Sequence, residues 1–394
     1  MEIKKIDITE NQTKIAIVAI GYNRLVSLAR LLDSLLNAEY HTDAPLIISI
    51  DCSGCTELYD FVQNFEWPFG DKYVNIQQKR LGLKNHIFQC GDLSKYFKAV
   101  ILLEDDTFVA PDFYKYMSRS VEKYTSNEDV ASIAGYFNEM YGYVGLPYAP
   151  MCNGFDVFAS QEVSSTGECF TYNMWQRFRD WLADYDLDNF NMESYELPIQ
   201  IKQWRRAWTK YFNAYLVEKN KYSIYPQYSI ITNCGDAGDH NSDPTTMVQV
   251  KLMMGHCEYL LPDFDSITKY DIFGNNMALY GVLNLNKQML CLDLYGNNPN
   301  ANNRRYILTI KKMPFEVVRS FGLSFRPQEL NIILGIEGND ICLYDTTKPT
   351  HKKVKSGIPD AVIRYHLQGF NIWFLLQIVI RQIKNHIKHR LHLQ

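Results

Sequence analysis

Short apolar runs and helical patterns alternate through the first 117 residues, and this alternation restricts the fold more than any other feature of the chain. The apolar runs cover residues 14–20, 46–50, 73–77 and 99–103. Leucines recur at helical spacing between residues 25 and 36, and a weaker helical pattern spans residues 84–97. Apolar runs of this length are typical of buried parallel strands. The order predicts an α/β fold with a mostly parallel sheet and helices on both faces.

Polar residues stand directly after three of these runs. Asn23 lies in the turn after the first run, Asp51 follows the second, and Glu104-Asp105-Asp106 follow the last. Ligands of open α/β sheets bind beyond the carboxyl ends of the strands. We therefore expect these side chains to converge on one crevice.

The three consecutive carboxylates are costly at the end of a buried strand, because like charges repel and burial removes their water. Mg²⁺ or Mn²⁺ prefers such hard oxygen ligands and commonly shares them with nucleotide phosphates. The alternative is a helix start, with Asp105 or Asp106 as N-cap or with Pro111 in the first turn. That alternative does not explain three acids after five apolar residues. The segment therefore predicts a metal-diphosphate site.

The longer string Leu103–Phe113, LEDDTFVAPDF, resembles glycosyltransferases of the GT-A (Rossmann-like) fold. Within that fold it is most similar to the N-acetylglucosaminyltransferase I-like enzymes, which carry Glu-Asp-Asp and then Ala-Pro-Asp-Phe. Ile17–Arg24 (IVAIGYNR), Ile48–Ser53 (ISIDCS) and Lys79–His86 (KRLGLKNH) resemble segments of bacterial family 2-like transferases in the same order. The resemblance is good over residues 14–117, moderate to about residue 240, and absent after about residue 260.

The resemblance implies roles for single residues. Asp106 would be the direct metal ligand, Asp105 would lie near the ribose or the metal waters, and Glu104 would lie near the donor sugar as a catalytic residue. The nucleotide and diphosphate would contact a further set of residues: Gly21, Asn23, Arg24, Asp51, Arg80 and Lys84. For the basic residues the alternative is a solvated surface charge. The implied cofactors are Mn²⁺ or Mg²⁺, with a UDP-sugar as the expected donor.

An inverting transfer also needs a general base for the acceptor hydroxyl. Related enzymes place an Asp directly after a Trp, but this chain has Trp208-Thr209, and threonine cannot serve. Glu168, within the string Ser164–Trp175, is the substitute candidate; the alternative is a first-turn acid favoured by the helix dipole. His240, near Asp236 and Asp239 on a Gly-rich loop, would close over the diphosphate, or it forms a simple surface pair. Four tryptophans would stack on sugars or, more simply, pack in the core: Trp175, Trp181, Trp204 and Trp208.

The later chain is less regular. Helices are expected over residues 171–184 and 199–219, a strand over 222–226, and strand-like pieces over 306–310 and 330–334. We divide the chain into a glycosyltransferase domain (1–258), an accessory region (259–360) and a basic amphipathic C-terminal helix (361–394). The first domain has a nucleotide-sugar half (1–117) and an acceptor half (118–258). The C-terminal regions together form a smaller α+β part.

Composition limits the partners and the location. The formal charge of −4 gives no sign of a nucleic-acid-binding domain. No apolar run reaches the ~20 residues of a membrane-spanning helix, and the N-terminus does not resemble a secretory signal. Residues 361–394 contain five Lys or Arg and no acid, with an apolar stripe at helical spacing. We therefore expect a cytoplasmic protein whose C-terminal helix binds the inner-membrane surface, or alternatively packs on the domain or a partner subunit.

Together these features predict a metal-dependent, inverting hexosyl- or N-acetylhexosaminyltransferase. It would transfer sugar to a glycan or lipid-linked glycan, in bacterial surface polysaccharide synthesis. One alternative is a nucleotidyltransferase, but the turn Gly21-Tyr-Asn-Arg24 is not the Gly-rich phosphate loop such enzymes usually carry. The other is a non-catalytic sugar- or nucleotide-binding protein with a decayed site. The missing Trp-Asp favours this second alternative, and the intact Glu-Asp-Asp opposes it.

Overall fold

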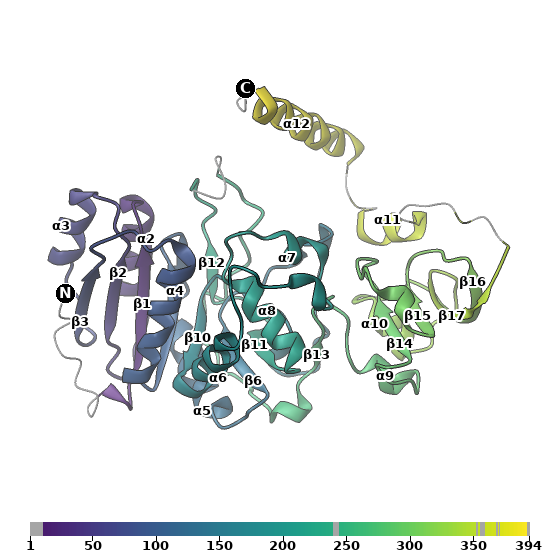
Figure 1. The fold of residues 1–394 in the computed structure, drawn as a ribbon, viewed down its shortest axis with the longest axis horizontal. Helices are drawn as coiled ribbons and strands as arrows, with labels where there is room; N and C mark the ends of the chain where they lie inside the picture. The colour runs from purple at the N-terminus through teal and green to yellow at the C-terminus, as the bar shows by residue number, and fades with distance from the viewer. Residues whose placement is uncertain are drawn as a thin grey trace.

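The protein is built around a nine-stranded sheet (Figure 1). The computed structural model describes residues 11–238, 244–351, 354, 359–367, 369 and 371–391. The strand order is β13-β9-β11-β6-β10-β4-β1-β2-β3. The bounds are β1 (Ile15–Gly21), β2 (Leu46–Ile50), β3 (Lys72–Ile76), β4 (Ala99–Glu104), β6 (Val130–Ala134), β9 (Val157–Ser160), β10 (Glu168–Thr171), β11 (Tyr222–Pro226) and β13 (Lys269–Tyr270). Strands β1 to β4 pair in parallel, whereas β10 is antiparallel to both of its neighbours. The mostly parallel α/β sheet predicted from the sequence is confirmed.

Helices cover both faces of this sheet, and strand β1 shows why. Its side chains alternate, with Ile15, Ile17 and Ala19 in one apolar core and Ala16, Val18 and Ile20 in the other. The first core also contains side chains of α2 (Leu25–Leu36), α3 (Thr56–Asn64) and α5 (Phe113–Tyr124). The second contains side chains of α4 (Leu83–Gly91), α6 (Tyr172–Ala183) and α8 (Thr209–Glu218). A strand buried on both faces reads as a continuous apolar run, as the sequence does here.

The tryptophan-rich middle of the chain forms much of the second core. Trp175, Trp181 and Trp208 are buried there, so core packing, the simpler of the two interpretations, is confirmed for these three. The helix predicted over residues 171–184 is α6, and its N-cap Thr171 accepts a hydrogen bond from the Met174 amide. The single helix predicted over 199–219 is wrong. The chain forms α7 (Ile199–Gln203) and then α8, with a break that places Trp208 in the core.

A second, four-stranded sheet follows, in the order β14-β15-β17-β16, and it has an apolar core of its own. Its strands are β14 (Leu290–Asp293), β15 (Tyr306–Thr309), β16 (Phe315–Phe321) and β17 (Ile341–Pro349), with α9 (Leu279–Val282) and α10 (Glu329–Ile333) beside them. The strand-like piece predicted over 330–334 is wrong, because these residues form α10. The large sheet also extends past residue 258 of the predicted domain division, since β13 pairs in parallel with β9.

Short elements complete the fold. Two small antiparallel pairs are β5 (Thr107–Val109) with β12 (Ile231–Asn233), and β7 (Met140–Tyr141) with β8 (Leu146–Pro147). The 3₁₀ turns are η1 (Asp92–Tyr96), η2 (Met192–Ser194), η3 (Phe264–Ser266) and η4 (Ala301–Asn303).

The C-terminal region forms two helices, α11 (Asp360–Leu367) and α12 (Ile372–Leu391). Figure 1 shows α12 standing apart from the two sheets. Its large apolar side chains are open to solvent, with Ile372 and Trp373 68% and 72% exposed. Within the described part of the chain, no helix combines the length and the apolar character that crossing a membrane requires.

Candidate active site

The carboxyl ends of β1, β2 and β4 lie side by side. Ile20 is in register with Glu104, and Gly21 is in register with Ile50. The turn after β1, Asp51 after β2 and the acids after β4 therefore meet at one edge of the sheet. They line a single pocket, whose walls are Ile20, Gly21, Tyr22, Asn23, Arg24, Asp51, Arg80, Gly82, Leu83, His86, Glu104, Asp105, Asp106, Asp236 and Gly238.

Arg24 holds the acidic strand end. It precedes α2, and its guanidinium donates to both carboxylate oxygens of Asp105, through Nη2 and, at 3.3 Å, through Nε. Nη2 also lies 3.3 Å from an oxygen of Asp106. This paired geometry between a guanidinium and a carboxylate fixes the position of the Asp105 side chain.

The negative charge of Glu104, Asp105 and Asp106 exceeds the positive charge of Arg24, which faces them. Burial raises the pKa of Glu104 to about 8, and the two neighbouring aspartates add to the shift. Burial also raises the pKa of Asp105 to about 6 although Arg24 opposes it. The Glu104 Oε1 atom is buried and accepts no hydrogen bond. Three carboxylates beside one guanidinium leave two negative charges when all are ionised, and the donors are hard oxygens, so these residues fit one Mg²⁺ or Mn²⁺ ion.

Asp51 organises the loop beside the pocket. Its Oδ1 accepts hydrogen bonds from the amides of Cys52 and Leu81, both at 2.8 Å, and Oδ2 accepts one from Gly82 at 2.9 Å. The guanidinium of Arg80 lies over the ring of Tyr22, 4.7 Å from its centroid. Arg80 thus lies among the residues that line the pocket, and Asp51 holds the adjacent backbone in place.

No role was assigned from the sequence to His86, which lines the pocket, or to Asn233, which contacts the pocket residue Asp106. His86 is buried, its Nε2 lies 2.8 Å from the Ser49 hydroxyl, and burial lowers its pKa. Its position at the end of the basic string 79–86 was the available signal. Asn233 donates to the Asp106 carboxylate at 3.2 Å, and it opens the Gly-rich loop that the sequence marked.

The segment 234–238 closes one side of the pocket. Its Asp236 pairs with Arg30 and accepts a hydrogen bond from Ser27 at 2.6 Å, which fixes the segment to α2. The Cys234 amide donates to the Asp106 carbonyl at 2.7 Å. His240, predicted to close over the diphosphate, and its neighbour Asp239 fall outside the described residues.

Two predicted site residues lie away from the pocket walls. The ammonium of Lys84 lies 5.6 Å from the centroid of the Tyr211 ring, on α8. Glu168 is only 1% exposed and sits within β10, in register with Leu102 and Ala134 of the neighbouring strands. The alternative of a first-turn acid is wrong for Glu168, because α6 begins four residues later.

The buried Glu168 carboxyl is only partly satisfied. Oε1 accepts a hydrogen bond from the Ser164 amide at 3.0 Å, whereas Oε2 is buried without a partner. Burial raises its pKa to about 8. A carboxyl in this setting is favoured in its protonated form at neutral pH, which does not suit a base.

Glu168→Gln is therefore expected to stabilise the protein at alkaline pH. Because the folded-state pKa is raised, the wild type has its full stability below the unfolded value of ~4.5 and loses it as pH rises through about 8. Glutamine avoids this loss, so its advantage should grow by about 3 kcal/mol between pH 5.5 and 8.5. Denaturant unfolding at both pH values measures it, with the exposed Glu122→Gln as control. An advantage independent of pH would contradict the expectation, and a loss of turnover at unchanged stability would restore the base role.

Comparison with known proteins adds the following. No protein-family model matches the chain, and no curated protein matches it. Solved structures that resemble it include the mannosyltransferase PcManGT from Pyrobaculum calidifontis with GDP-Man and Mn²⁺, at 10% identity and a TM-score of 0.31. S. aureus TarS with UDP-GlcNAc is 12% identical to this chain, with a TM-score of 0.36. GalNAc-T7 with UDP, GalNAc and Mn²⁺ is 11% identical, with a TM-score of 0.38. The matches cover 42%, 58% and 55% of this chain, and 46%, 60% and 43% of those chains, respectively.

Proposed function

We propose that this chain is a metal-dependent glycosyltransferase of the GT-A type that uses a nucleotide diphosphate sugar. One observation carries the proposal: three carboxylates at the end of β4 face a pocket together with the turn after β1 and the loop held by Asp51. This arrangement combines a cation site with room at the strand ends, where open α/β sheets bind nucleotides. A UDP-sugar with Mn²⁺ or Mg²⁺ is the proposed donor complex.

Within this proposal each pocket residue has a separate role. Asp106 is the direct metal ligand, Asp105 stays paired with Arg24, and Glu104 faces the donor sugar. The bound ion would offset negative charge on the leaving diphosphate as a Lewis acid. Gly21, Asn23 and Asp51 line the nucleotide side. Arg80 lies in the same pocket and would donate to the diphosphate, whose charge suits a guanidinium.

Glu104 is the better candidate to act on the reacting sugar or acceptor. It lines the pocket, whereas Glu168 is sealed within the sheet. An inverting transfer to a glycan or lipid-linked glycan, in bacterial surface polysaccharide synthesis, is the finer proposal. The division into a glycosyltransferase domain, an accessory region and the C-terminal helix (361–394) belongs to the same proposal, with the first boundary moved from residue 258 to a position after β13, which pairs with β9.

A thermal-shift screen of the full chain tests the proposal. Nucleoside diphosphates and nucleotide sugars are added with and without Mn²⁺. A Tm increase that needs both the ion and a diphosphate supports a transferase. A nucleotidyltransferase would instead respond to nucleoside triphosphates, and a response to free sugar without Mn²⁺ would favour the non-catalytic binding protein. The absence of any shift with a diphosphate and Mn²⁺ would defeat the proposal.

We also propose that α12 binds an anionic lipid surface. The helix exposes Trp373, Leu376 and Ile380 at helical spacing, and these side chains are 72%, 46% and 52% exposed. No acidic residue occurs after Asp360, while basic residues are interleaved with the apolar ones. Apolar insertion combined with attraction to anionic headgroups is the way interfacial helices bind.

Replacing Trp373, Leu376 and Ile380 together by serine is expected to reduce binding to anionic vesicles at least tenfold. Each exposed apolar side chain contributes on the order of 1 kcal/mol or more when it enters the lipid boundary. Vesicle flotation of the full chain measures the change. Val318→Ser, an equally exposed apolar residue on β16, is the matched control. Binding by the triple variant equal to that of wild type would contradict the lipid proposal, as would no flotation of wild type at physiological salt.

A further inference from the structure

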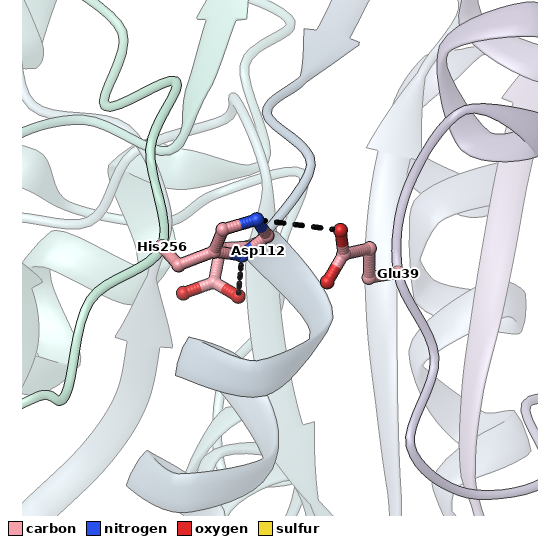
Figure 2. A group of neighbouring side chains, drawn as sticks. All are labelled: Glu39, Asp112 and His256. Carbon is pink, nitrogen blue, oxygen red and sulfur yellow. Dashed lines mark ion pairs between the residues drawn. The ribbon is translucent and has the colours of Figure 1, made fainter.

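A second group of potential metal ligands lies outside the pocket (Figure 2). Glu39 follows α2, Asp112 stands immediately before α5, and His256 comes from the chain that leads to β13. Figure 2 shows the imidazole between the two carboxylates. One ligand atom from each residue lies within 4.8 Å of the other two.

The spacing of this group is too wide for hydrogen bonds. His256 Nε2 lies 3.5 Å from Glu39 Oε1, and His256 Nδ1 lies 3.6 Å from Asp112 Oδ1. Hydrogen bonds between nitrogen and oxygen are usually about 2.7–3.2 Å long. These two contacts use opposite nitrogens of the imidazole, and a single ion binds only one of them. The spacing that bears on a shared ion is therefore that of one ligand atom from each residue, and these three atoms lie within 4.8 Å of one another.

The Asp112 carboxylate supplies an independent sign of a ligand. Its side chain is only 1% exposed, and its Oδ1, which faces His256, makes no hydrogen bond of good geometry, although the Tyr259 hydroxyl interacts with this carboxylate. Asp112 occupies the N-cap position of α5, yet its side chain makes no capping bond there. Its Oδ2 instead accepts a hydrogen bond from the Cys257 amide at 3.0 Å. A buried carboxylate oxygen without a well-aligned donor is costly, and a cation would satisfy it.

The backbone around the group is already held in place. The Glu39 amide donates to the Pro111 carbonyl at 2.9 Å, which joins the end of α2 to the start of α5. The Cys257 amide joins the third segment to Asp112, as described above. Glu39 and His256 are 47% and 65% exposed at the side chain, so an ion from solvent reaches them directly.

We propose that Glu39, Asp112 and His256 bind a divalent transition ion of the Zn²⁺ class. An imidazole ligand favours Zn²⁺ over Mg²⁺ or Ca²⁺, and three protein ligands leave further positions for water. The site is distinct from the pocket, because α2 separates them: Arg24 precedes its first residue and Glu39 follows its last. The ion would join three segments, including the one that continues from the pocket residue Asp236 towards His256.

Titration of the full-length protein with Co²⁺ and Zn²⁺ tests the site. Wild type is expected to give a visible Co²⁺ absorption band without the thiolate charge-transfer band of a cysteine site, and Zn²⁺ should raise its Tm. His256→Gln and Glu39→Gln should weaken the apparent affinity at least tenfold. Glu39 is exposed, so its variant also keeps the test valid if the His256 variant folds poorly. His41→Gln, which removes another exposed histidine close in sequence to Glu39, is the matched control.

The outcomes separate this site from the proposed catalytic one. Asp106→Asn should keep the Co²⁺ band and the Zn²⁺ shift, whatever its effect on nucleotide binding. A band that disappears in Asp106→Asn and persists in His256→Gln would overturn the proposal. So would a Tm unaffected by Zn²⁺ but dependent on histidine protonation, which would indicate that the three residues form only an ion pair.

Discussion

Asp106→Asn is expected to abolish the Mn²⁺-dependent binding of a nucleoside diphosphate and to reduce sugar transfer at least ~100-fold. The substitution keeps the size of the side chain and its contact with Asn233, but it removes a negative charge from the group that faces the pocket. An amide is a weaker ligand for a hard divalent ion than a carboxylate. Thermal shift with UDP, with and without Mn²⁺, and a transfer assay measure the two effects.

The control for this substitution is Asp263→Asn. Asp263 is 87% exposed at the side chain and pairs with Lys123 on the surface, so the same chemical change there should leave binding unaltered. An Asp106→Asn protein that keeps the full Mn²⁺-dependent shift with UDP would contradict both the metal-ligand role and the proposed chemistry. If the Tm of Asp106→Asn lies below that of wild type by the same amount with and without UDP and Mn²⁺, the substitution causes only a folding defect.

Local sequence pattern was sufficient to predict the fold of the nucleotide-sugar half (residues 1–117). The apolar run of β1 carries residues for two cores in alternation, and such a run fits a strand covered on both faces. From the parallel order it followed that the strand ends meet, and Asp51 and Glu104 do lie in one pocket. Local pattern and the rule for open sheets are enough to bring these two side chains together.

Contacts between distant segments could not be predicted in this way. Asp236 reaches the pocket because it pairs with Arg30 and Ser27, more than 200 positions earlier in the chain. Glu168 reads locally as an acid near a helix start, but pairing with two other strands draws it into the sheet. Residues 330–334 have strand-like composition, yet they form α10. There the Asn331 Oδ1 atom accepts hydrogen bonds from the backbone amides of Ser324 and Phe325. Tertiary contacts outweigh propensity in each case.

Arg24→Met is expected to destabilise the metal-free protein by about 2 kcal/mol at neutral pH, because it removes charged hydrogen bonds from a buried carboxylate. Asp105 is 7% exposed at the side chain, and its pKa is already raised to about 6 with Arg24 in place. Without the guanidinium the pKa should rise further. A raised carboxyl pKa gives full stability below the unfolded value of ~3.9, and this stability is lost as pH rises through the folded value. The loss of unfolding free energy in Arg24→Met, relative to wild type, should therefore grow from pH 5 to pH 8.

The dependence on metal distinguishes this effect from a general packing loss. A divalent ion brings positive charge to the same carboxylates, so Mn²⁺ should stabilise Arg24→Met more than it stabilises wild type. Arg24→Lys keeps the positive charge but cannot form the bidentate contact with a carboxylate. Its free energy of unfolding should therefore lie between those of wild type and Arg24→Met. The exposed Arg119→Met should change the free energy of unfolding by less than ~0.5 kcal/mol. A deficit that is constant with pH and unaffected by Mn²⁺ would mean that Arg24 contributes packing alone, and that the acids at the end of β4 do not need its charge.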